Sequence, residues 1–397
     1  MTFDTHRLKR IDEHFKAYVD DGRLAGWQVM VGQHDEVVHT ATYGVADLAS
    51  SRPVADDTLW RIYSMTKPIV SVAAMQLWEQ GVFELTDPIS RWLPAFADVR
   101  VWADGTNSAP RTVPATEPIR MWHLLTHTSG LTYGFMQLHP VDAIYRAAGM
   151  DFGYPRGSDL AVACDLLATM PLKFQPGSAW SYGVSTDVLG RVLEVMTGKP
   201  LDELLVDQLL GPLGMTDTTW WVDAPDLDRL ATLYVIAGGE LVPYPPLGDV
   251  ALSKPRVLNG GGGLISTAAD YWRFCRMLHN GGELEGTRIV GPRTLDLMGA
   301  NHLPGNQDLA VVNSGGFAET IFEGIGFGLG FATVLDPLPG KTGASAGELF
   351  WGGLASTAFW VDRSTGVSAA FYTQLVPSST YPIRSQLRQL VYSALLD

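Results

Sequence analysis

The two ends of the chain carry different hydrophobic patterns. Between residues 4 and 21, apolar side chains recur every three or four positions at Leu8, Ile11, Phe15 and Tyr18, which predicts an amphipathic helix that ends near Gly22. Two apolar runs then flank a polar turn at residues 34–36, which is typical of a β-hairpin. A helix followed by antiparallel strands predicts an α+β opening.

The middle of the chain is dominated by helical patterns. Residues 64–80 are apolar nearly all round, so we expect a buried helix that ends at Gly81, with Pro68 in its first turn. Further helices are predicted over 118–127, 186–197, 201–210 and 268–279, whereas residues 100–115 and 303–320 are expected to be loops.

Strand patterns return in the last third of the chain. Residues 350–361 and 367–376 are rich in aromatic and β-branched side chains, and an amphipathic helix follows from about residue 383. The simplest α+β architecture is one antiparallel sheet built from both termini and flanked by helices. Residues 1–85 and 260–397 would form this discontinuous domain, residues 86–259 an inserted, mainly helical domain, and the active site would lie between them.

Composition narrows the class of function. The net charge is −14, so we expect neither nucleic acid nor an anionic membrane as a partner. The N-terminus has no apolar signal region, which favours a cytoplasmic location. The two cysteines, Cys164 and Cys275, are far apart in sequence, and we expect no disulfide framework.

Candidate chemistry begins at Ser64, which opens the buried helix three residues before Lys67. Residues three apart share a helix face, so the amine can reach the hydroxyl and act as its base. Burial lowers the cost of keeping that amine neutral, and the helix N-terminus favours a developing oxyanion. Alone, S-x-x-K is a weak signal, because many serines and lysines fall at this spacing by chance.

Several other segments make the pattern specific. Tyr63-Ser-Met-Thr-Lys-Pro68, Leu124-Leu-Thr-His-Thr-Ser-Gly-Leu131, Trp180-Ser-Tyr-Gly-Val184, the Gly260–Asp270 stretch and Trp351-Gly-Gly353 follow one another in order. Together they resemble the class C β-lactamases, the DD-peptidases and, above all, the family VIII carboxylesterases, over roughly residues 10–395. The resemblance implies a class C β-lactamase-like fold and a serine hydrolase that forms an acyl-enzyme.

The same resemblance assigns roles to three side chains. Ser64 would attack the carbonyl carbon, and Lys67 and Tyr182 would share the base role, with Tyr182 returning a proton to the leaving alcohol. We expect the ammonium of Lys67 to favour the phenolate of Tyr182. Which of the two takes the first proton stays open, since coupled groups titrate as a unit. Asp187 is expected to cap or brace the helix after Tyr182.

The third motif of the family has two candidates here. Lys341-Thr-Gly343 matches K-T-G literally, but the residues after it are not strand-like. A strand pattern follows Trp351-Gly352-Gly353, the W-G-G form found in family VIII esterases. We take W-G-G as the edge of the site and K-T-G as a coincidence, so the backbone N–H groups of Ser64 and Leu354 would form the oxyanion hole.

Two other motifs would indicate a different kind of active site, but each lacks a residue that its chemistry requires. Gly343-Ala-Ser345-Ala-Gly347 fits the nucleophile elbow of α/β-hydrolases, but no histidine follows it, as that triad order requires. His123 and His127 have the spacing of a zinc pair, but the glutamate of H-E-x-x-H is missing, so packing and turn bonding are preferred. We predict no metal and no cofactor.

Two departures from the lactamase pattern bear on the substrate. Val184 stands where Y-x-N has asparagine, and Trp351 replaces the lysine of K-T-G, so polar recognition of a carboxylate is lost. We therefore expect a small neutral ester of short to medium acyl length, bound by residues 351–353, Val184 and Tyr133. The alternatives are a β-lactamase or DD-peptidase, an acyltransferase to an alcohol, and a penicillin-binding-like module without turnover. The sequence does not indicate an oligomeric state.

Overall fold

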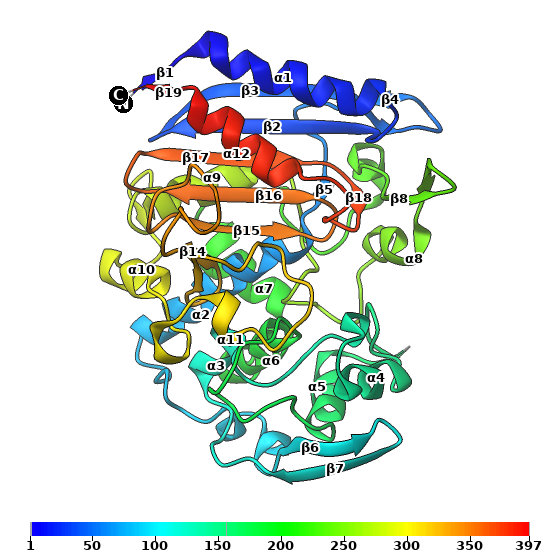
Figure 1. The fold of residues 1–397 in the computed structure, drawn as a ribbon, viewed down its shortest axis with the longest axis vertical. Coiled ribbons are helices and arrows are strands. Elements are labelled where there is room, and N and C mark those ends of the chain that lie inside the picture. The colour runs from blue at the N-terminus through cyan, green and yellow to red at the C-terminus, as the bar shows by residue number, and fades with distance from the viewer. Residues whose placement is uncertain (1, 156, 397) are drawn as a thin grey trace.

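A computed structural model describes residues 2–155 and 157–396, and its centre is an antiparallel sheet of eight strands. Both ends of the chain supply these strands, as Figure 1 shows by their blue and orange colours. In spatial order they are β13 (Ile325–Phe327), β14 (Ala332–Val334), β15 (Leu349–Gly353), β16 (Thr357–Asp362), β17 (Val367–Tyr372), β2 (Gly26–Gln33), β3 (Glu36–Asp47) and β4 (Arg52–Pro53). The predicted sheet from both termini is confirmed.

Helices cover both faces of this sheet. On one face the first and last long helices lie side by side (Figure 1), namely α1 (Thr5–Asp20) and α12 (Ile383–Ser393). On the other face α9 (Ala268–His279) packs against β2, β16 and β17. Every residue of β15, β16 and β17 is buried, because both faces are covered. The chain ends also meet, through β1 (Thr2–Phe3) and β19 (Leu395–Leu396).

Residues 86–259 supply most of the remaining helices. The buried helix α2 (Thr66–Glu79) packs against α6 (Ser185–Thr197). The helices of the insert are α3 (Met121–Leu125), α4 (Pro140–Ala147), α5 (Leu160–Ala168), α6 (Ser185–Thr197) and α7 (Leu201–Leu205), which a short π-helical turn continues to Leu210. Cys164 and Cys275 are buried and free.

Two parts of the insert differ from the sequence expectation. Residues 100–115 are not a loop: β6 (Arg100–Thr106) and β7 (Ala109–Pro114) form an antiparallel hairpin whose side chains are mostly exposed. Because neither face of this hairpin is buried, its sequence lacks an apolar alternation. Moreover, β8 (Tyr234–Ala237), which pairs with β9 (Glu240–Pro243), also pairs with β18 (Leu375–Val376) near the C-terminus. Part of the segment 86–259 therefore packs against the terminal body.

Other short elements connect these layers. They are α8 (Pro245–Gly248), α10 (Pro292–Gly299), α11 (Leu309–Val312), β5 (Trp60–Arg61), β10 (Ile265–Ser266), β11 (Glu283–Leu284) and β12 (Thr287–Arg288). The turn over 303–306 and α11 lie in the stretch that was expected to be a loop, and the rest of that stretch is irregular. β5 matters most for function, because it leads directly into Ser64 and pairs with β10.

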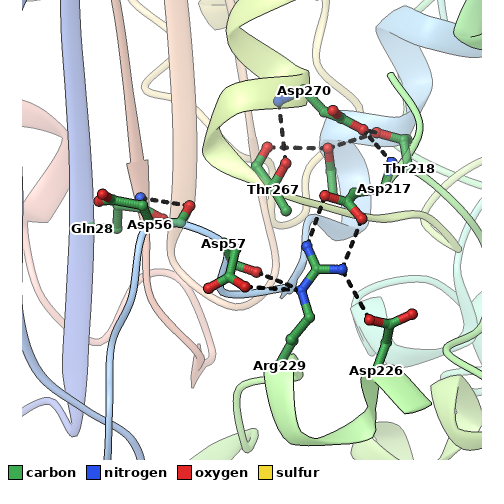
Figure 2. Close-up of polar contacts among 10 residues, drawn as sticks. Gln28, Asp56, Asp57, Asp217, Thr218, Asp226, Arg229, Thr267 and Asp270 are labelled. Carbon is green, nitrogen blue, oxygen red and sulfur yellow. Dashed lines mark hydrogen bonds and ion pairs between the residues drawn. The ribbon is translucent and has the colours of Figure 1, made fainter. Parts of the chain in front are cut away.

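An ionic network anchors the chain just before β5 (Figure 2). The guanidinium of Arg229 contacts the carboxylates of Asp57, Asp217 and Asp226. The network continues through Thr218, whose hydroxyl donates to Asp270 near the start of α9. These contacts link the segment before β5 and the residues around Asp217 and Arg229 to α9.

Candidate active site

Ser64 lies at the start of the buried helix. A 3₁₀ turn over Tyr63–Met65 leads into α2, so Ser64 occupies the first turn of a helical segment. Tyr63 has a φ of 43°, in the left-handed region that a side chain of this size rarely adopts. Such a conformation is held only by its surroundings and is typical of functional sites. The turn places the Ser64 hydroxyl at a cavity wall, where the residue is 8% exposed.

Lys67 reaches Ser64 as the spacing predicts. Its Nζ lies 3.1 Å from Ser64 Oγ and 3.1 Å from the Tyr133 hydroxyl, and it also donates to the carbonyl oxygen of Gly261. The side chain is almost completely buried. Burial lowers the pKa of Lys67 to about 8, although the charges of Asp187 and Glu319 oppose this. The amine is therefore accessible in its neutral, proton-accepting form near physiological pH.

Tyr182 lies beside this pair. Its ring centroid is 4.6 Å from Lys67 Nζ, and its hydroxyl accepts a hydrogen bond of 3.2 Å from Trp351 Nε1. Burial raises the pKa of Tyr182 well above its ordinary value, and Glu319 adds to the shift, whereas hydrogen bonds with Ser64 and Trp351 act against it. The expectation of a phenolate is thus wrong: desolvation outweighs these hydrogen bonds and the charge of Arg384, and the raised pKa favours the neutral phenol.

The imidazole ring of His127 packs against the ring of Tyr182. Its ring lies 5.1 Å from the Tyr182 ring and 5.5 Å from that of Phe327, and Trp180 stacks on the same tyrosine. Burial lowers the pKa of His127 well below its usual value, so the imidazole is neutral. Within the described residues no group of three or more histidine, cysteine, aspartate or glutamate side chains is arranged to hold a metal ion.

Three residues of the glycine run, 261–263, line the same cavity as Ser64. Gly261 accepts from Lys67 through its carbonyl oxygen, while its N–H donates to Asp187 Oδ1 at 2.9 Å. A Cβ on Gly261 would lie 2.8 Å from the Asp187 carboxylate, so only glycine allows this approach. Asp187 does not cap α6, because Val184 occupies the N-cap position. Instead it braces the backbone that holds Lys67, and burial raises its pKa.

The end of β15 lies close to the segment that carries Ser64. A Cβ on Gly353 would lie 2.3 Å from the carbonyl oxygen of Ile62, which leaves no room for a side chain at this position. Leu354, the next residue, lines the same cavity as Ser64. The two proposed oxyanion-hole residues thus border one space, as the position of W-G-G requires.

The cavity at Ser64 has a volume of about 150 Å³ and is lined mainly by apolar and aromatic side chains. Its walls include Ser64, Tyr133, Tyr182, Leu354, Phe135, Phe152, Trp220, Leu247, Val257 and Phe317. Tyr133 was predicted to bind substrate and lies at this wall. The other residues predicted to bind substrate are not among the described lining residues of this cavity: Val184, Trp351, Gly352 and Gly353. Val184 is the N-cap of α6, and residues 351–353 are buried within strand β15.

The two rejected motifs lie elsewhere. Lys341 is exposed, and its Nζ donates to the carbonyl oxygens of Leu338 and Pro339. Ser345 donates its hydroxyl hydrogen bond to Asp362 at 2.6 Å. Neither residue borders the cavity that contains Ser64 among the residues the structure describes. Both motifs therefore occur in a loop without the partners their chemistry needs.

Comparison with known proteins decides the family. The Beta-lactamase family matches residues 11–393, which is nearly the whole chain. The chain belongs to the Beta-lactamase family. It is therefore a serine hydrolase, and the resemblance inferred from its motifs is confirmed.

Relatives within the Beta-lactamase family include named esterases. Esterase EstB of Burkholderia gladioli is 33% identical over 97% of this chain and 95% of its own length. Protein Rv1367c of Mycobacterium tuberculosis is 36% identical over 90% of this chain and 88% of its own. The solved structure of EstCE1, described as a hydrolase with promiscuous acyltransferase activity, is 30% identical over 98% of this chain and 99% of its own, with a TM-score of 0.84. The predicted β-lactamase-like fold is confirmed.

Several residues of this site were not found from the sequence. Glu319 lies in a stretch expected to be a loop, yet it is 2% exposed and lines the cavity at Ser64. Arg384, from the last helix, pairs with it at 2.5 Å. No local pattern signals a pair whose members are separated by 65 positions. The glycine run at 260–263 did stand out in the sequence, but its contact with Lys67 and Asp187 depends on tertiary packing.

Proposed function

We propose that the chain hydrolyses carboxylic esters of short to medium acyl length through an acyl-enzyme on Ser64. The observation that carries the proposal is the contact of 3.1 Å between a fully buried lysine amine and the Ser64 hydroxyl at the wall of an apolar cavity. Named esterases among the relatives support it, including Lovastatin esterase of Penicillium rubens at 29% identity over 96% of both chains.

The geometry suggests an order of proton transfers. Lys67 accepts the Ser64 proton as Oγ bonds to the acyl carbon, because the neutral amine is a stronger base than the neutral phenol of Tyr182. When the ester C–O bond breaks, Tyr182 gives its proton to the leaving alkoxide and receives one from the Lys67 ammonium. Water then attacks the acyl-enzyme with the same groups in reverse roles, releasing the acid and restoring Ser64.

The lining of the cavity favours a neutral substrate. Arg61 is buried, and its guanidinium is occupied by the carbonyl oxygens of Ala231 and Gly248. Glu319 is occupied by Arg384. Most N–H donors of Arg61 are therefore already used by the protein, and stacked Phe135 and Phe152 offer apolar surface. A small acyl ester loses nothing in such a site, whereas a carboxylate-bearing lactam leaves its charge unpaired.

A second candidate is acyl transfer to an alcohol acceptor. Monacolin J acid methylbutanoyltransferase of Aspergillus terreus is 30% identical over 82% of this chain and 79% of its own length. The acyl-enzyme is common to both reactions, and only the acceptor differs. The size of the cavity admits a small acyl group with either water or a short alcohol.

One experiment separates these reactions. Turnover of p-nitrophenyl butyrate and of nitrocefin is measured for the wild type and for Ser64→Ala, with and without added butanol. The proposal predicts fast ester cleavage, slow nitrocefin cleavage and loss of both in the variant. Fast nitrocefin turnover would identify a β-lactamase instead, and butyl butyrate formation that exceeds hydrolysis would identify an acyltransferase. Ester cleavage that survives Ser64→Ala would contradict the nucleophile.

A further inference from the structure

Two arginines one turn apart on α12 each pair with a buried glutamate. Arg384 contacts Glu319 at 2.5 Å, and Arg388 contacts Glu348 at 2.5 Å. Both glutamates are at most 2% exposed. The pairs are alike in residue type and burial, so each is expected to contribute similarly to the stability of the fold.

The two arginines differ in what else they touch. Arg388 lies over the rings of Phe350 and Trp360, in the interior of the sheet. Arg384 instead donates from Nη2 to the carbonyl oxygens of Gly353 and Thr357, each at 3.0 Å. Arg384 therefore binds the two strand ends that flank the turn after W-G-G, whereas Arg388 makes no such contact with the described backbone there.

The carbonyl group of Gly353 and the N–H group of Leu354 belong to the same peptide unit. A cation bound at the carbonyl oxygen polarises that unit and makes its N–H a stronger hydrogen-bond donor. Together with the Ser356 N–H, which donates to the same oxygen at 3.0 Å, it also fixes the plane of the peptide, and with it the direction of the N–H. Leu354 lines the cavity at Ser64, so this is the N–H that would meet a developing oxyanion.

The glycines of the motif fit this arrangement. A Cβ on Gly352 would lie 2.3 Å from Arg384 Nη2, so glycine at this position makes room for the guanidinium. A Cβ on Gly353 would lie 2.3 Å from the carbonyl oxygen of Ile62, so glycine there makes room for the segment that carries Ser64. Gly352 thus leaves space for Arg384 on one face of β15, and Gly353 leaves space for the segment that carries Ser64 on the other.

We propose that Arg384 is a positioning residue for the oxyanion hole: it holds and polarises the Gly353–Leu354 peptide from behind the sheet, and Glu319 holds Arg384. The proposal rests on the proposed function, because it concerns the same acyl transfer. Arg384 touches no reacting atom in this scheme. Its effect belongs to the transition state, in which charge develops on the carbonyl oxygen, rather than to binding of the neutral ester.

The test compares Arg384→Ala with Arg388→Ala as a matched control. Thermal unfolding is recorded for both, and kcat and KM for p-nitrophenyl butyrate are measured on folded protein. We expect both variants to melt earlier, but only Arg384→Ala to lose kcat, on the order of 10²-fold with little change in KM, as for loss of an oxyanion donor. Arg384→Lys retains the charge but cannot bridge the same acceptors, so its kcat should be intermediate.

Two readouts separate positioning from a loss of structure. Inhibition by butylboronic acid, whose adduct with Ser64 resembles the tetrahedral intermediate, should weaken in Arg384→Ala by about the same factor as kcat/KM. Added guanidinium at non-denaturing concentration should restore part of the kcat of Arg384→Ala and none in Arg388→Ala. If Arg384→Ala does not fold, Arg384→Lys is judged by the same boronate comparison.

Equal kcat losses in the two alanine variants would overturn the proposal, as would a loss confined to KM. Boronate inhibition that stays unchanged while kcat falls would also overturn it. Failure of the proposed function is a separate result, because it shows in the wild type: if wild-type protein does not cleave the ester, the reaction itself is wrong. The ratios between variants are then measured with whichever chromogenic acyl compound the wild type does cleave.

Discussion

Two regions of this molecule carry hydrolase motifs, and only one provides their chemistry. The segment around Ser64 has S-x-x-K, and the loop 341–347 has both K-T-G and G-x-S-x-G. At the first, the lysine is buried and its amine touches the serine hydroxyl at 3.1 Å. At the second, the lysine is exposed and binds backbone carbonyls, and the serine binds Asp362.

The difference is one of environment rather than residue type. Burial lowers the pKa of Lys67 to about 8, so the amine can accept a proton. Lys341, in contrast, is exposed, and its amine contacts backbone carbonyl oxygens rather than a serine hydroxyl. Lys341 borders a second cavity of about 420 Å³ beside α12, which shares Phe317 and Glu319 with the cavity at Ser64 but does not include Ser64 itself. A motif thus predicts chemistry only when the fold supplies its partners and excludes water from them.

The largest expected effect comes from the two serines. Ser64→Ala should reduce kcat for p-nitrophenyl butyrate by on the order of 10⁴-fold or more, because it removes the nucleophile. Ser345→Ala should leave kcat unchanged, since its hydroxyl only contacts Asp362. Steady-state kinetics of both variants tests the comparison, and the reverse result would move the active site to the loop.

The two lysines give the next largest difference. Lys67→Ala should lower kcat by on the order of 10³- to 10⁴-fold through loss of the base. Lys341→Ala should change neither kcat nor KM, because the lysine is exposed and lines another cavity. Circular dichroism verifies that both variants fold. An activity loss in Lys341→Ala would show that K-T-G takes part in the reaction.

Removal of the Tyr182 hydroxyl should have a somewhat smaller effect. Tyr182→Phe keeps the ring among its aromatic neighbours but cannot return a proton to the leaving group, so kcat should fall on the order of 10²- to 10³-fold. Esters with good leaving groups should suffer less than alkyl esters, and a series of leaving groups measures this. An equal loss across the series would exclude Tyr182 as the general acid.

The pH dependence should show the smallest effect of this group. The neutral amine of Lys67 is the active form, so kcat/KM should increase with pH through about 8 and then level off. Below that pH the rate should fall by about tenfold per pH unit, since protonation removes the base. Lys341→Ala should not move this midpoint. A midpoint near 10.5 in the wild type would mean that Lys67 is not desolvated in solution.

The elements that pack against the hydrophobic core were predictable, because their buried positions appear in the sequence as apolar patterns. The apolar stripe of α1 and the all-round apolar sequence of α2 reflect contacts with the core, and so do β15 to β17. The hairpin β6–β7 was missed because its side chains face solvent and carry no periodic pattern. Among the residues that the structure describes, no helix is long and apolar enough to cross a membrane.

The site was predictable where its contacts are local and unpredictable where they are not. Ser64 and Lys67 are neighbours on one helical turn, so their spacing alone brings them together. The contact of Asp187 with Gly261 and that of Arg384 with Gly353 join distant segments. The protonation state of Tyr182 also depends on how far burial raises its pKa against nearby charges. The sequence does not show how deeply the ring is buried.

The most direct test of the central claim is the identity of the acylated serine. The wild type is mixed with p-nitrophenyl butyrate, quenched in acid within the first turnovers and digested for mass spectrometry. A butyryl group on Ser64, absent in Ser64→Ala and formed as fast as p-nitrophenol is released, is the predicted result. A butyryl group on Ser345, or turnover with no acylated peptide, would contradict the account.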